Sequence, residues 1–302
     1  MSFRKTAQVQ FLGVQHQGSW SKSASHSKSS SFYMDEDGSI NVEAALDTVA
    51  SPYRISRDPR NYLFIPLRAN SADRPNNNLD GWELTELQRY DDIVGTPVYR
   101  TYDLKPHFVN HNAADLTLSR GVILDSHLNM QNPADDMVKQ AVFEATGKEV
   151  DQDIFVELLV AVDTTKDPAL AEAYRKGSVD SFSMGCDVVA TQCSACANVA
   201  TNDFQLCSCI RGKHSRIPVE CEDGERRLAW EKCMGTIFQE ISAVDDPADE
   251  TAIVQEGILK VAGSVALNRA QLQEITVFVV RHAHTMPETV ADVLNRALRM
   301  VN

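Results

Sequence analysis

The sequence lacks features that whole classes of protein require. Across 302 residues no run approaches the roughly 20 apolar residues of a membrane-spanning helix, and the amino-terminal segment has no apolar stretch typical of a secretory signal. Basic residues are in the minority, since 29 Lys and Arg stand against 42 Asp and Glu, for a net charge of −13. This acidic balance argues against non-specific nucleic-acid binding. We therefore expect neither a membrane nor a nucleic-acid partner.

Cysteine is absent from most of the chain. All seven cysteines lie between Cys186 and Cys233. An odd, local set does not suit a disulfide framework spread over a secreted chain, and it favours a metal-binding knuckle in a reducing compartment. With 43% apolar and 24% charged residues, the composition is typical of a globular, intracellular protein.

Local composition divides the chain into three parts. Residues 1–55 contain a serine-rich stretch at 19–31 that cannot build a core, so we expect a flexible arm with one short helix near residues 40–50. Residues 56–255 form the predicted main domain, with a Cys-rich insertion at 190–215. Residues 256–302 are expected to be mostly helical.

Hydrophobic patterning predicts both strands and helices in the main domain. Strands are expected at residues 63–67, 96–100, 121–125, 154–162, 179–189 and 235–244, and helices at 83–90, 137–146 and 167–176. The last helix has Asp167 as its N-cap and ends at Gly177. Because helices and strands do not alternate regularly, the predicted class is α+β.

Three separated segments carry catalytically useful side chains. They are HFVNHN at 107–112, SFSMG at 181–185 and EISAVDDPAD at 240–249. A serine becomes a nucleophile when a neighbouring base accepts its proton, and that base needs a third group to orient it. A histidine, a serine and an acid from three strands could meet this requirement, although spacing alone does not establish a triad.

The order of these segments, with DGWEL at 80–84 and Pro97 before them, is similar to that of the prohead (capsid maturation) proteases of tailed bacteriophages, which are related to the herpesvirus assemblins. The resemblance covers residues 62–252, about two-thirds of the chain. Its most specific parts are SMG at 183–185 and the segment ending at Asp249. It implies a small closed or partly closed β-barrel surrounded by helices, interrupted by the Cys-rich, zinc-knuckle-like insertion.

The resemblance also implies an activity and its residues. Ser183 matches the nucleophile and His111 the general base, with His107 as the competing histidine. Gly185 is expected to leave room for backbone amides that stabilise the oxyanion. The implied enzyme is a serine endopeptidase, needing no cofactor for catalysis. It would process scaffold and major capsid proteins, and itself, inside the assembling prohead in the host cytoplasm. The alternative is a catalytically silent, zinc-stabilised structural protein of the phage particle with the same fold.

The third member of the triad is open among three carboxylates. Glu240 follows the serine in the chain, as the third residue of the assemblins does. Glu157 and Asp163, on the strand predicted before the serine, are the alternatives. A carboxylate in this role holds the imidazole in one tautomer and stabilises its charged form.

Four cysteines have the spacing of a metal site: Cys193, Cys196, Cys207 and Cys209. A C-x-x-C pair and a C-x-C pair joined by a ten-residue loop can enclose a tetrahedral Zn²⁺. His214 is the alternative to Cys209 as the fourth ligand. Because protein would fill all four positions, this zinc would be structural. The remaining thiols are expected to be buried: Cys186, Cys221 and Cys233. Cys186 also offers a rival nucleophile for an unrelated hydrolase.

Overall fold

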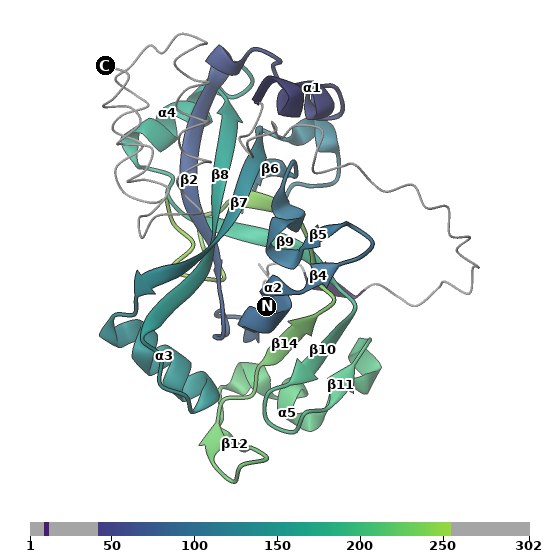
Figure 1. Cartoon of the computed structure of the whole chain (residues 1–302), viewed down its shortest axis with the longest axis vertical. Coiled ribbons are helices and arrows are strands. Elements are labelled where there is room, and N and C mark those ends of the chain that lie inside the picture. The colour runs from purple at the N-terminus through teal and green to yellow at the C-terminus, as the bar shows by residue number, and fades with distance from the viewer. Residues whose placement is uncertain (1–8, 12–41, 255–302) are drawn as a thin grey trace, which may run out of the picture.

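The computed structural model describes residues 9–11 and 42–254, shown in colour in Figure 1. Most of the expected arm and all of the expected helical segment at 256–302 lie outside the described residues. The helices are α1 (Val42–Tyr53), α2 (Leu84–Gln88), α3 (Asp136–Thr146), α4 (Pro168–Lys176) and α5 (Ser208–Arg211), and short 3-10 turns occur at η1 (Pro59–Asn61), η2 (Val98–Tyr102), η3 (Leu116–Leu118), η4 (Asp203–Gln205) and η5 (Lys213–Ser215). Among these described helices, none is long and apolar enough to span a membrane.

Seven strands form the main sheet, in the order β1-β9-β15-β6-β7-β8-β2. Their bounds are β1 (Val9–Phe11), β2 (Tyr62–Ser71), β6 (Pro106–Val109), β7 (Gly121–Pro133), β8 (Gln152–Asp163), β9 (Phe182–Val188) and β15 (Ile237–Ala243). Strand β15 lies between β9 and β6, so Ser242 is opposite Ser183 of antiparallel β9 and Phe108 of parallel β6. This register brings all three sequence segments with catalytic side chains to adjacent strands.

A second, four-stranded sheet has the order β11-β10-β14-β3. It consists of β3 (Asp80–Gly81), β10 (Ala190–Cys193), β11 (Val199–Ala200) and β14 (Glu231–Met234). Two small hairpins complete the strands, β4 (Tyr90–Asp91) with β5 (Thr96–Pro97) and β12 (Val219–Glu220) with β13 (Arg226–Arg227). In Figure 1 the second sheet and α5 lie at the end of the molecule away from α1 and α4. The cysteine-rich segment therefore belongs to a small sheet separate from the main one, which β3 and β14 complete.

The expected class, α+β, is confirmed, whereas the expected barrel is not. In the part of the chain that the structure describes, neither sheet closes, and β1 and β2 are the edges of the main sheet. Val254 makes an isolated bridge to Leu67 of β2, and Ile253 makes one to Ser181 just before β9. These bridges join the two sides of the sheet without adding a paired strand, because they involve single residues.

Side chains along each strand point alternately to the two faces of the sheet, and they contribute to two separate cores. The larger core takes Phe182 and Met184 from β9 and Ile241 from β15, together with the buried Trp82 and Tyr102. On the opposite face of β7 and β8, α1 packs its apolar side against a second core. Residues that alternate with the larger core on β9 and β15 point to the other face of the sheet, and these are the polar ones.

Several local signals are confirmed. The side chain of Asp167 accepts a hydrogen bond from the backbone N–H of Leu170 (3.0 Å), and Gly177 ends α4 with a φ of +67°. The strand predicted at 96–100 is wrong beyond Pro97, since the chain turns into η2 there. The buried side chains of Val98, Thr101 and Tyr102 follow helical spacing, because packing against β15 decides this segment.

Candidate functional site

His111 follows β6, where the chain turns sharply. Asn110 and His111 both have left-handed backbone conformations, with φ values of +51° and +54°. The N–H of Asn110 still donates to the carbonyl of Ala243 (2.8 Å), and the N–H of His111 donates to the hydroxyl of Ser242 (3.2 Å). The turn is therefore tied to β15, and it directs the imidazole back over that strand.

Glu240 is the partner of this imidazole. Its Oε1 lies 2.7 Å from His111 Nδ1, and its Oε2 accepts a hydrogen bond from Ser242 Oγ (2.5 Å). The carboxylate side chain is only 5% exposed, whereas the imidazole is 18% exposed. Both oxygens of a buried carboxylate thus have partners, as a buried charge requires.

Gly185 provides the space for this carboxylate. It lies opposite Glu240 on β9, and a Cβ built at Gly185 would be 2.6 Å from Glu240 Oε1 and 3.0 Å from its Cγ. A side chain at Gly185 would therefore require Glu240 to move. The oxyanion role suggested by the sequence for Gly185 stays a prediction; in the structure Gly185 leaves the gap into which Glu240 folds.

Ser183 lies on the same face of the sheet as Glu240 and Ser242. It is directly opposite Ser242, and directly opposed residues of antiparallel strands have Cβ atoms about 5 Å apart on one face. The structure therefore brings His111 and Glu240 into contact and places Ser183 on the adjacent strand. Among the described residues no hydrogen bond joins Ser183 to His111, and Ser183 is 5% exposed.

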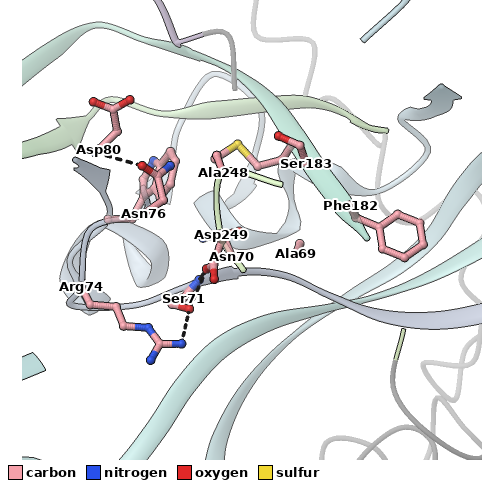
Figure 2. A pocket seen from close by; sticks show the side chains of 12 residues that line it. Ala69, Asn70, Ser71, Arg74, Asn76, Asp80, Phe182, Ser183, Ala248 and Asp249 are labelled. Atoms are coloured by element: carbon pink, nitrogen blue, oxygen red, sulfur yellow. Dashed lines mark hydrogen bonds between the residues drawn. The ribbon is translucent and has the colours of Figure 1, made fainter. Parts of the chain in front are cut away.

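The other side of β9 contains a polar cluster that anchors the end of the third segment. Asp249 Oδ2 accepts from the N–H and the hydroxyl of Ser71 at the end of β2 (3.0 and 2.7 Å), and Arg74 donates to the same hydroxyl. Figure 2 shows these residues together, with the Ser183 hydroxyl pointing away from them. The Pro-Ala-Asp ending thus links β2 to the chain after β15, and Ala248 and Asp249 line a small pocket together with Ser183.

His107 is occupied elsewhere. It is fully buried, its Nδ1 lies 3.0 Å from the carbonyl of Ile241, and its Nε2 lies 2.8 Å from the hydroxyl of Tyr174. Burial lowers the pKa of His107 to about 4, so the ring is neutral, with Nδ1 donating to the carbonyl and Nε2 accepting from the tyrosine. Neither nitrogen is left to accept a proton from Ser183.

Neither the two alternative acids, Asp163 and Glu157, nor the rival nucleophile Cys186 is positioned for catalysis with His111. Asp163 ends β8 and accepts hydrogen bonds from Ser56 N–H and from Thr165. Glu157 lies on β8, opposite Arg68 of β2 and not beside His111. Cys186 is 2% exposed, and burial raises the pKa of its thiol well above the ordinary value. It therefore stays protonated and is a poor nucleophile.

The four cysteines with metal-site spacing come together: the sulfurs of Cys193, Cys196, Cys207 and Cys209 all lie within 4.8 Å of one another. They could hold a metal ion, as expected from their spacing, and four thiolates are a donor set that zinc prefers. His214 is exposed and lies outside this group.

The first cysteine pair lies in a tight turn. The N–H of Ala195 donates to Cys193 Sγ (3.4 Å), the N–H of Ala197 donates to the carbonyl of Cys193 (3.1 Å), and Ala197 has a φ of +52°. Donation to a sulfur suits a thiolate ligand, because it offsets part of the negative charge. Burial raises the pKa of Cys193 to about 12 without a metal, so metal binding would have to displace its proton.

A buried ion cluster connects the cysteine segment to the second sheet. Lys213 Nζ contacts Asp80 of β3 (2.5 Å) and Glu231 of β14 (2.6 Å), and Thr191 of β10 donates to the other oxygen of Glu231 (2.8 Å). The segment is therefore joined through β10 directly to β9, the strand that carries Ser183.

Comparison of the chain with protein-family models, with curated proteins and with solved structures finds no match. Ser242 was missed in the sequence analysis, although Glu240 and Ser242 are two residues apart on a predicted strand and so had to share a face.

Proposed function

We propose that the chain is a serine endopeptidase with Ser183 as nucleophile, His111 as general base and Glu240 as the carboxylate that orients the base. One observation carries the proposal: Glu240 binds Nδ1 of His111, on the face of the sheet where the Ser183 side chain lies. With Nδ1 donating to the carboxylate, Nε2 is the nitrogen with a lone pair for the serine proton.

The reaction would then proceed by acyl transfer. Ser183 Oγ attacks the carbonyl carbon of the scissile bond while its proton passes to His111 Nε2. The imidazolium, stabilised by Glu240, returns this proton to the leaving amine, and an ester to Ser183 remains. Water, deprotonated by the same nitrogen, then hydrolyses the ester and frees the enzyme. The hydrogen bond between Ser183 and the base would form as substrate binds, since such bonds are often loose in the free enzyme.

The substrates and setting are part of the proposal and rest on the resemblance of the sequence alone. We propose scaffold and major capsid proteins, together with other copies of this chain, as substrates within an assembling prohead. Confinement there raises the local concentration of substrate, so modest affinity suffices. We further propose that the four-thiolate group binds a structural Zn²⁺, which supplies order to its segment and takes no part in the reaction.

A fluorophosphonate probe tests the reaction class, because it reacts with activated serines. We expect labelling of Ser183, located by peptide mass spectrometry, and no labelling of Ser183→Ala or of heat-denatured protein. A library of synthetic peptides then tests endopeptidase activity: new internal cleavages should appear with the wild type only. Co-expression with candidate scaffold and capsid proteins tests the setting, as these should be shortened by the wild type and not by Ser183→Ala.

The opposite result has a clear meaning. A folded, metal-loaded chain that neither reacts with the probe nor cleaves any peptide would replace the protease by the silent structural protein, since the fold can persist without catalysis.

A further inference from the structure

Three hydrogen bonds close a ring around His111, and Ser242 completes it. The N–H of His111 donates to Ser242 Oγ (3.2 Å), this hydroxyl donates to Glu240 Oε2 (2.5 Å), and Glu240 Oε1 contacts His111 Nδ1 (2.7 Å). The ring begins at the backbone of His111 and ends at its side chain. One serine therefore contacts both the turn and the carboxylate beside the imidazole.

We infer that Ser242 is a positioning residue of the proposed active site, acting on His111 through Glu240; this inference rests on the proposed function. Ser242 is fully buried, so its hydroxyl is not in contact with bulk water. A serine hydroxyl has one proton and two lone pairs, and here the proton is committed to the carboxylate and a lone pair to the backbone. Its role is thus distinct from that of Ser183, whose hydroxyl has no such commitments among the described residues.

The energetic reason lies in the carboxylate. A buried carboxylate needs donors on both oxygens, and a charge-assisted hydrogen bond is about twice as strong as a neutral one. Without the hydroxyl, Glu240 would turn its second oxygen toward another donor and draw away from Nδ1. The N–H of His111 would lose its acceptor at the same time, and the left-handed turn would lose a tie to β15. Both effects misdirect Nε2.

The variant Ser242→Ala tests this role, with Ser119→Ala as a matched control. Ser119 is equally buried and also adjoins β6, but its hydroxyl donates to the carbonyls of His107 and Gly121. We expect Ser242→Ala to slow fluorophosphonate labelling of Ser183 by about 10- to 100-fold, the range for one hydrogen bond to a charged group. Ser119→Ala should label at nearly the wild-type rate, and Ser242→Thr should recover part of the loss.

A double-mutant cycle separates positioning from general damage. The loss that passes through the carboxylate is already present in Glu240→Gln, so adding Ser242→Ala there should cost clearly less than it does in the wild type, and the remainder is the loss of the acceptor for the His111 N–H. An equal loss in both backgrounds, or full labelling by Ser242→Ala alone, would overturn the inference.

Imidazole N–H resonances give a readout that is independent of activity. In ¹⁵N-histidine-labelled protein, the His111 Nδ1–H bound to Glu240 should give a downfield proton signal that moves or broadens in Ser242→Ala and not in Ser119→Ala. The Nδ1–H of His107, bound to the carbonyl of Ile241, reports that the protein is folded. If wild-type Ser183 does not react, the proposed function fails. Ser242 is then judged by this resonance alone, and an unmoved signal rejects the inference.

Discussion

The two candidate sites are arranged in different ways. The His111–Glu240 pair is positioned by strand register and hydrogen bonds, and its contacts exist without any ligand. The cysteine group lies in a segment of very short elements, and the small core beneath it has Ile210 as its only fully buried large aliphatic residue. A core of that size contributes little stability by itself. The sheet supports the first site, whereas we expect the order of the second to depend on the proposed metal.

The largest expected effect separates the two histidines. His111→Ala should reduce labelling of Ser183 at least about a thousandfold, because the base is removed, and it should cost about 1 to 3 kcal/mol of stability, because Glu240 Oε1 loses its donor. His107→Ala should lower stability by about 2 to 4 kcal/mol, from a cavity and two broken hydrogen bonds, while the folded fraction still reacts. Labelling kinetics and urea unfolding of both variants give the comparison. Equal losses of reactivity in folded protein would contradict the roles proposed here.

Removing the metal should affect the cysteine segment first. Cys196→Ser, or chelation, should remove close to one zinc per chain and increase hydrogen exchange across residues 190–234, while α1 and β8 keep their protection. Labelling of Ser183 should fall about tenfold or less, because β10 continues directly from β9. His214→Ala is the control and should keep its zinc, since His214 lies outside the thiol group. A metal-free chain with unchanged exchange would show that the segment is ordered without a metal.

Gly185 offers a smaller test of the first site. In Gly185→Ala the new Cβ would push Glu240 away from His111, so labelling should slow by about tenfold, the lower range for loss of a charged hydrogen bond. Gly212→Ala is the control, because the contact at Gly212 is looser (3.3 Å) and the residue also lacks a positive φ. If Gly185→Ala reacts normally and keeps the His111 resonance, the gap at Gly185 does not serve Glu240.

The sequence could predict features whose signal lies in neighbouring residues, but not features that depend on contacts between segments far apart in the chain. Caps and strand cores are local, so the N-cap at Asp167 and the strand containing Glu157 could be located from their own neighbours. The cysteine spacing likewise implied four thiols that meet. The pairing of Glu240 with His111 depends on β15 lying between β9 and β6, a long-range choice that no local pattern contains. Ser242 became significant only once that pairing was known.

Acidification should act on the two regions in opposite directions. Lower pH protonates thiolates and would release the proposed metal from the cysteine group. In the sheet region, burial raises the pKa of Asp103 from its ordinary 3.8 to about 7. The negative charge of Asp125 also raises this pKa, whereas the positive charge of Arg100 lowers it. Asp103 lies just before β6, 2.9 Å from the Arg100 guanidinium, and it accepts a hydrogen bond from Ser126 (2.6 Å).

The sign of the stability change follows from this raised pKa. The folded state binds a proton that the unfolded state has released above pH 3.8, so stability contributed by the protonated acid is complete below that pH and is lost as pH rises to about 7. Asp103→Asn has no such loss, so relative to the wild type it should gain up to about 3 kcal/mol between pH 5 and pH 8. Urea unfolding of both proteins at the two pH values measures this difference, in which the common effect of the thiolates cancels. A difference that does not change with pH would mean that Asp103 is charged in the folded protein at pH 5, and that the ion pair with Arg100 outweighs its burial.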